Sequence, residues 1–241
     1  MGTAYNANIV TDGLVLCLDA ANPRSYPGSG TTWYDLSGNG NHSNLTTGNM
    51  GSSNWNNGVF DFDGSDDYIE IANSPSIAIT NNLTMSIWIR PEDLTSSMAP
   101  FLKQWCNGNQ FAYFSIINTD GTLRYAFDND GACDVTTGNS ISNDPVIQIN
   151  NWYNISITHT SSGIGMYING ESISFSFTGT YSTIKNSNRP FRIGGYQGLY
   201  ALSPDSNFIN GKVSSLNMYN KALSAQEIRQ NFNATRGRYG I

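Results

Sequence analysis

Short stretches of alternating apolar and polar residues recur along the whole chain, which indicates β-strands with one buried face. In residues 83–90, every second residue from Leu83 to Ile89 is apolar, and Pro91 ends the run. Comparable runs occupy residues 13–19, 59–64, 68–71, 111–118, 122–127, 152–160, 164–170, 171–177, 191–196 and 212–219. Glycine and asparagine separate most of them, as expected for strands joined by tight turns. The pattern predicts an all-β protein.

An Asp-Gly pair at 120–121 separates two of these runs, which is a strong hairpin signal. In a two-residue turn, Thr119 pairs with Thr122, and the same register places Cys106 nearly opposite Cys133. These two cysteines are therefore candidates for a disulfide at the open end of the hairpin. The chain has three cysteines, and an odd number argues against a disulfide framework. Cys17 lies in an apolar run, and we expect a buried free thiol there.

One helix is expected, over residues 224–234. Ser224 and Glu227 form the sequence signature of a capping box, and Leu223 with Ile228 can form a hydrophobic staple. The helix is amphipathic through Ile228 and Phe232, so it should pack on the outside of the strands. The predicted fold is a two-sheet antiparallel jelly-roll sandwich with one short C-terminal helix, in a single domain over residues 12–241. Residues 1–11 are expected to form an arm.

Composition excludes several classes of partner. Only 12% of residues are charged and the net charge is −6, with the few cations scattered until the C-terminal end. Nucleic-acid-binding proteins show a clustered basic face, so DNA and RNA are not expected partners. No apolar run approaches the roughly 18 residues that span a membrane. The first residues lack a signal-peptide pattern, so we expect either a mature form or a protein released by lysis, as virion proteins are.

Acidic residues are densest at Asp63, Asp66, Asp67 and Glu70, which could supply oxygen ligands to calcium. The alternative is a solvated turn in which the aspartates bond to their own backbone. Glycosidases need two carboxylates at a defined separation, and the nearest candidates, Asp61 and Asp63, share one face of a strand. Gly64 and Ser65 end that strand, so we expect an exposed face there and no catalysis.

Sugar binding needs an aromatic ring beside groups that fix hydroxyls. Two loops combine rings with amides, and early loops hold two further rings. The alternative is that these rings fix their loops or face a neighbouring subunit. The candidates are Trp105, Asn107 and Asn109 in one loop, Tyr196, Gln197 and Tyr200 in another, and Trp33 and Trp55 near the start of the chain.

The sequence of segments resembles a known superfamily. The resemblance covers about residues 13–234, and its closing segment continues to Gly240. In order, the segments are GLVLCLDAANPRSYPGSGTTWYDLSGNGNHSNL, VFDFDGSDDYIEI, LTMSIWIRP, NNWYNISITHTSSGIGMYINGE, FRIGGY and GKVSSLNMYNKALSAQEIRQNFNATRGRYG. This order resembles the laminin-G-like jelly rolls of concanavalin A-like lectins and glucanases. The opening and closing segments are similar to versions found in virion proteins of tailed bacteriophages. The resemblance implies a non-enzymatic virion surface protein, on a capsid or a tail fibre, that recognises host-surface glycans.

One departure concerns the closing strand. Many members of the family carry acidic residues after its Gly-x-Val pattern, whereas here Gly211 and Val213 are followed by Ser214 and Ser215. A family-style calcium site is therefore in doubt. Two other functions stay open: a purely structural decoration subunit, which contacts other virion proteins or copies of itself, and a secreted bacterial carbohydrate-binding domain.

Overall fold

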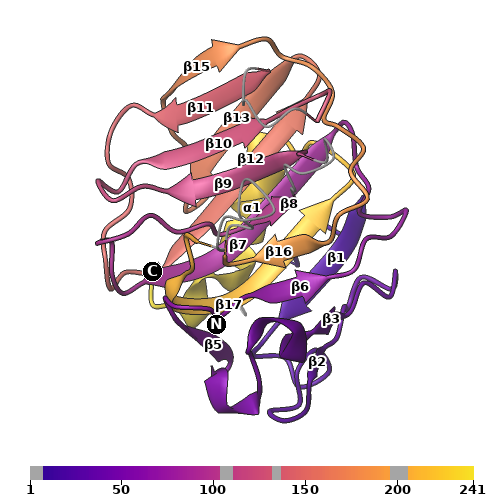
Figure 1. Ribbon diagram of the computed structural model, residues 1–241, viewed down its shortest axis with the longest axis vertical. Coiled ribbons are helices and arrows are strands. Elements are labelled where there is room, and N and C mark those ends of the chain that lie inside the picture. Colours follow the sequence, from indigo (N-terminus) through magenta and orange to yellow (C-terminus); the bar gives the residue numbers. More distant parts are fainter. Residues whose placement is uncertain (1–7, 104–110, 132–136, 196–205) are drawn as a thin grey trace, which may run out of the picture.

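The protein is a sandwich of two antiparallel sheets packed face to face (Figure 1), as the alternating pattern predicts. The computed structural model describes residues 8–103, 111–131, 137–195 and 206–241. All strand pairings in these ranges are antiparallel. In the same ranges, no helix combines the length and hydropathy needed to span a membrane.

The first sheet has the strand order β14-β13-β12-β7-β17-β5-β4, and β1 also pairs with β17. It lies behind the other sheet in Figure 1. Its strands are β1 (Leu14–Asp19), β4 (Trp55–Asn56), β5 (Val59–Asp63), β7 (Leu83–Pro91), β12 (Tyr153–Thr160), β13 (Gly163–Ile168), β14 (Glu171–Ser172) and β17 (Asn210–Tyr219).

The second sheet has the order β15-β11-β10-β9-β8-β16-β6-β3-β2 and faces the viewer in Figure 1. Its strands are β2 (Thr32–Trp33), β3 (Ser43–Asn44), β6 (Ile69–Ile71), β8 (Leu102–Lys103), β9 (Tyr113–Ile117), β10 (Leu123–Phe127), β11 (Gly138–Ser142), β15 (Phe175–Gly179) and β16 (Phe191–Ile193). The described residues also form short 3-10 helices in the connections and near the C-terminus: η1 (Leu45–Gly48), η2 (Ser52–Asn54) and η3 (Arg236–Arg238).

The core lies between the sheets and follows the predicted alternation. On β5 the rings of Phe60 and Phe62 point inward, and on β6 Ile69 and Ile71 do so, whereas the residues between them are only partly buried. Cys17 is a buried free thiol, as expected.

The helix α1 (Ala225–Thr235) covers the outer face of the first sheet, and the predicted capping box is present. The Ser224 hydroxyl accepts a hydrogen bond from the Glu227 N–H, and the Glu227 carboxylate accepts one from the Ser224 N–H at 2.8 Å. Trp88 of β7 stacks on Tyr239, with 3.8 Å between ring centroids, in the segment that follows the helix. This cover explains why β7 is buried on both faces rather than on one.

The hairpin between β9 and β10 corrects the predicted register. Leu123 pairs with Ile117, so the pairing is offset by one residue from the expected Thr119–Thr122 pair. The Asn118 N–H donates to the Thr122 carbonyl at 2.9 Å, which leaves a three-residue loop ending in Gly121 with φ of 82°. A three-residue loop with glycine in this conformation is the next most common hairpin after the two-residue turn.

The N-terminal segment is held against the helix where the structure describes it. The Val10 N–H donates to Asn231 at 2.8 Å, and the Tyr219 hydroxyl donates to the Val10 carbonyl at 3.1 Å. The Gln230 side chain donates to the Asn8 carbonyl. Residues 8–10 therefore pack on the domain, and the limits of an N-terminal arm stay a prediction.

Candidate calcium-binding turn and carbohydrate-binding hollow

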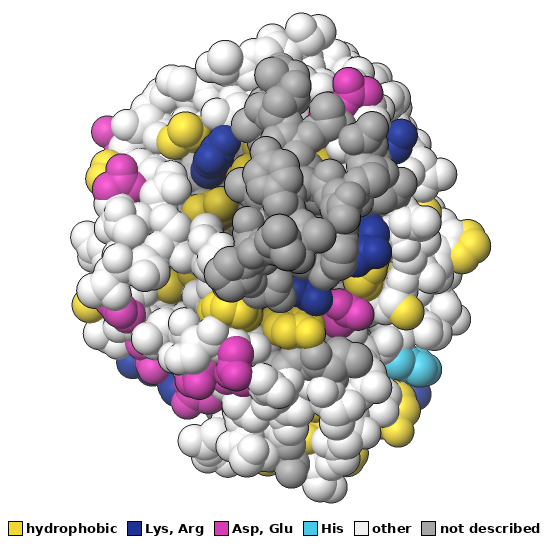
Figure 2. Space-filling model, in the orientation of Figure 1, with side chains coloured by type: hydrophobic (Ala, Val, Ile, Leu, Met, Phe, Trp, Pro, Cys, Tyr) yellow, Lys and Arg dark blue, Asp and Glu magenta, His cyan; other side chains and the backbone are white. Residues whose placement is uncertain are grey.

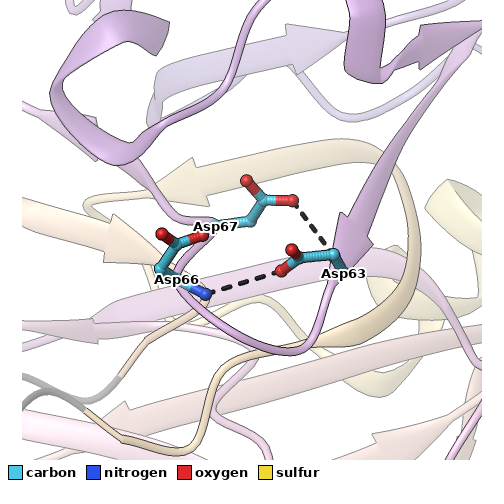
Figure 3. A group of neighbouring side chains, drawn as sticks. All are labelled: Asp63, Asp66 and Asp67. Carbon is cyan, nitrogen blue, oxygen red and sulfur yellow. Dashed lines mark hydrogen bonds between the residues drawn. The ribbon is translucent and has the colours of Figure 1, made fainter.

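Three aspartates meet in the turn between β5 and β6, which we name the aspartate turn (Figure 3). One carboxylate oxygen each of Asp63, Asp66 and Asp67 lies within 4.8 Å of the others. Asp63 ends β5, and Gly64, with φ of 79°, reverses the chain and brings the other two back toward it. In Figure 2 acidic side chains gather at the lower left of the face, in the part of the view where Figure 1 places β5.

Hydrogen bonds within the turn hold the aspartates in place. Asp63 Oδ1 accepts from the Ser65 N–H at 2.8 Å, and Asp67 Oδ2 accepts from the Asp63 N–H at 3.0 Å. The Asn54 amide also donates to Asp67 Oδ2, at 3.2 Å. These bonds are those expected for the alternative interpretation, a turn whose aspartates bond to their own backbone without a metal ion.

Electrostatics favours a cation at this position. Asp67 is 4% exposed, and burial raises its pKa to about 6, with further increases from the negative charges of Asp63, Asp66 and Asp61. The Asp63 N–H acts in the opposite direction. Calcium binds six to eight oxygens, so three carboxylates could supply part of its shell and water the rest. The turn fits calcium in charge and donor type.

Glu70, predicted as a fourth ligand, lies apart from this group. It is on β6, where its carboxylate pairs with the Arg192 guanidinium of β16 at 2.9 Å. That guanidinium also lies 4.0 Å from the centroid of the Tyr68 ring. The structure therefore brings together three of the four predicted ligands.

Asp61 and Asp63, the nearest candidates for a catalytic pair, are both engaged in other contacts. Asp61 is bound to Lys212 of β17, with 2.7 Å between Asp61 Oδ2 and Lys212 Nζ, and Lys212 also faces Glu92 at 3.4 Å. The Lys212 ammonium therefore occupies Asp61, whereas glycoside hydrolysis needs one carboxylic acid and one free carboxylate on either side of the scissile bond. Asp63 is engaged in the aspartate turn.

The residues that line a separate hollow of about 450 Å³ come from the segment after β6 and from the segment before β16. A hydrogen bond of 2.7 Å from the Ile184 N–H to the Thr80 carbonyl joins the two segments. Among the described residues, three asparagines contribute to the lining and no acidic residue does. We name it the amide hollow; its lining residues are Asn73, Ser74, Pro75, Ala78, Asn186 and Asn188.

Lys103 of β8 lies behind this hollow and is 2% exposed. Its ammonium donates to Asn73 Oδ1 at 2.6 Å and to the Ile77 carbonyl at 3.0 Å. Both acceptors are neutral, and burial lowers the pKa of Lys103 to about 8. The hollow is thus backed by a buried positive charge.

Most of the predicted sugar-binding residues lie outside the described residues. This holds for Trp105, Asn107 and Asn109, for Tyr196, Gln197 and Tyr200, and for the cysteine pair Cys106 and Cys133. Those assignments stay predictions.

The two early tryptophans fix their loops. Trp33 is fully buried against Phe60, with 4.8 Å between ring centroids, and the Trp55 indole donates to the Ala20 carbonyl at 2.9 Å. Among the described aromatic residues, Tyr34 and Tyr181 are exposed. Tyr181 stacks on Phe177, with 4.1 Å between centroids and 6° between planes. This pair is the described ring surface best suited to a sugar face.

Sequence reasoning missed the amide hollow. Asn73 and Asn186 belong to a chain rich in asparagine, so neither is conspicuous. The one available signal was Lys103, a charged residue directly after Phe101 and Leu102. A lone lysine after two apolar residues does not reveal which loops will cover it.

The comparisons with known proteins agree with the fold. The family model described as the concanavalin A-like lectin/glucanases superfamily matches residues 63–229. No curated protein matches the sequence. The structure is similar to Trypanosoma rangeli sialidase in complex with sialic acid, with a TM-score of 0.65 and 15% identity over 97% of this chain and 36% of that one.

The structure is also similar to the ligand binding domain of botulinum neurotoxin serotype D in complex with N-acetylneuraminic acid. The TM-score is 0.65 and the identity 17%, over 94% of this chain and 52% of that one. The chain thus spans about a third of the sialidase and about half of the toxin domain. The TM-scores show a similar fold, and identities this low extend the similarity no further than the fold.

Proposed function

The chain belongs to the concanavalin A-like lectin/glucanases superfamily, and from this premise we propose that it is a non-catalytic carbohydrate-binding protein. The amide hollow carries the proposal. Asparagine side chains both donate and accept hydrogen bonds, which matches the hydroxyl groups of a sugar. Two proteins of similar fold are complexes with sialic acid or N-acetylneuraminic acid, which supports a sugar as the ligand class.

The absence of catalysis is part of the proposal. The best-placed carboxylates for glycoside hydrolysis are Asp61, which is paired with Lys212, and Asp63, which is bonded within its turn. A hydrolase of this type needs one carboxylic acid and one free carboxylate on either side of the scissile bond. The described residues near β5 offer no such pair.

We further propose that the protein acts at a virion surface, among other virion proteins or copies of itself. The support is the resemblance of the opening and closing segments to those of tailed-phage virion proteins. Immuno-electron microscopy of native particles tests this location, and particles that carry no label would contradict it. A secreted carbohydrate-binding domain would then become the better assignment.

Binding is tested on a glycan array with the purified chain, followed by calorimetry on the best ligand. We expect Asn186→Ala to weaken binding about tenfold, the cost of losing hydrogen bonds to a bound sugar. Asn151→Ala is the matched control, because Asn151 is exposed and does not line the hollow. If Tyr181→Ala abolishes binding and Asn186→Ala does not, the site lies at the exposed ring instead.

Activity is tested by incubating the chain with the glycans that it binds, and with a fluorogenic sialoside. We expect no release of product above a buffer control. Release that is lost in an Asp61→Asn or Asp63→Asn variant would show that the protein is a hydrolase. If the array yields no ligand, carbohydrate binding fails and a structural decoration subunit remains.

A further inference from the structure

The ammonium of Lys103 is a buried charge without a carboxylate partner in the described part of the chain. Lysine is almost never fully buried unless it is paired, because removing its charge from water is strongly unfavourable. Two lysines that are only partly buried do have carboxylate partners: Lys212 pairs with Asp61, and Lys221 pairs with Asp12 and Glu227. Lys103 is more buried than either, and its acceptors in the described residues are neutral.

Asn73 connects this charge to the hollow. Its Oδ1 accepts from the Lys103 ammonium at 2.6 Å, so its Nδ2 lies on the other branch of the amide. Within the described part of the chain, that Nδ2 donates to no acceptor, and Asn73 itself lines the hollow. A hydrogen bond from a cation polarises the amide and strengthens its N–H groups as donors.

The other described lining residues also suit a negatively charged ligand. Asn186 is exposed and lines it, and its side chain makes no hydrogen bond to the described residues. The Ser74 hydroxyl is already used, since it donates to Asn41 Oδ1 at 2.6 Å. The hollow has amide donors at its wall and a buried cation behind it, and none of its described lining residues is acidic. These features favour an anion over a neutral group.

We infer that the amide hollow selects glycans that carry a carboxylate, with the Asn73 amide contacting that carboxylate and Lys103 supplying the charge behind it. The inference rests on the proposed function and names its ligand class: a uronic or a sialic acid residue. Asn186 contributes a second donor to the sugar. Lys103 is a positioning residue, since it acts through Asn73.

The test uses pairs of ligands that differ only in charge. Calorimetry compares methyl β-D-glucuronide with its uncharged carboxamide, and sialyllactose with lactose. We expect the full chain to bind each acid at least about tenfold more tightly than its neutral partner, the ratio expected for one charge-assisted hydrogen bond. In Lys103→Met this ratio should fall to about one.

Two variants keep the test informative. Asn73→Asp places a carboxylate against Lys103, which should preserve the fold and abolish binding of the acids even if Lys103→Met unfolds. Lys221→Met removes one positive charge elsewhere and should leave the ratio unchanged. Equal affinity for acid and neutral sugars, or an unchanged ratio in a folded Lys103→Met, overturns the inference and leaves carbohydrate binding intact. No binding of any sugar overturns both.

Discussion

At the scale of single residues, Asp67 lies in an environment that opposes its charge. Its pKa is about 6 in the folded chain, against an ordinary value of 3.8 in the unfolded chain. Between pH about 4 and 6 the folded chain therefore holds more protons than the unfolded chain. The free energy of unfolding consequently falls as the pH rises through that window, and above it the full cost is present.

Replacing Asp67 with asparagine should remove this cost. The amide oxygen can still accept from the Asp63 N–H and from Asn54, so the turn is preserved. We expect Asp67→Asn to raise the free energy of unfolding at pH 7 by roughly 1–3 kcal/mol and to change it little at pH 3.5. Urea denaturation at both pH values measures this. A loss of stability at pH 7 would show that the carboxylate is stabilising there.

Calcium bound to the same three carboxylates should stabilise the folded chain. If the ion binds the aspartate turn, millimolar calcium raises the melting temperature of the natural chain at pH 7, because it binds only the folded state. The rise should be smaller in Asp67→Asn and in Asp66→Asn. Magnesium, which dehydrates less readily, is the control ion. A melting temperature that is independent of calcium would leave the turn as local structure alone.

At the scale of elements, the capping box of α1 links the last strand to its cover. Ser224→Ala removes the acceptor for the Glu227 N–H, so we expect a loss of about 1 kcal/mol of unfolding free energy. Ser29→Ala, at an exposed serine outside the strands and helices, is the matched control and should change stability by under about 0.5 kcal/mol. Equal effects of the two changes would mean that the cap is not stabilising.

The β9–β10 loop depends on a glycine for two separate reasons. Gly121 has φ of 82°, and a Cβ there would lie 2.3 Å from the Ile147 carbonyl oxygen. Gly38 has φ of 90° with no atom within 4 Å of such a Cβ, so it isolates the backbone effect. We expect Gly38→Ala to cost about 1 kcal/mol and Gly121→Ala clearly more, measured by thermal unfolding. Similar costs would mean that the Ile147 contact relaxes freely.

The elements show what alternation can and cannot predict. It located the strands with one buried face, such as β5 and β6, and capping chemistry located α1. It treated residues 171–177 as one strand, whereas β14 joins the first sheet and β15 the second. Alternation continues through Ile173, so nothing local marks where the chain crosses between sheets. Strands of two residues, such as β8, are too short to show a period.

The aspartate turn and the amide hollow also differ in how far the sequence could predict them. Asp63, Asp66 and Asp67 lie close together in the sequence, so their grouping in one turn could be predicted from the sequence alone. Glu70 was included wrongly in that group by proximity in sequence, since on β6 its side chain faces Arg192. The hollow combines β8 with two loops more than a hundred residues apart, a proximity that only the folded sandwich creates.

At the scale of the whole molecule, the sandwich supplies a rigid frame and the loops supply chemistry. The two sheets bury a continuous apolar core, and the connections between strands carry the aspartate turn and most of the hollow. Sites on loops held by a rigid scaffold are the usual arrangement in binding proteins. The same frame accommodates proteins of very different sequence, as identities of 15% and 17% to the sialidase and the toxin domain illustrate.

The central claim, that the amide hollow binds a sugar, is tested most directly by nuclear magnetic resonance. Side-chain amide signals of Asn73 and Asn186 are followed while the isotope-labelled chain is titrated with sialyllactose, and then with lactose. We predict that both amide signals shift and saturate with sialyllactose, whereas the Asn151 signal stays fixed. Signals of Asn73 and Asn186 that do not move, with shifts confined to other residues or absent altogether, would contradict the claim.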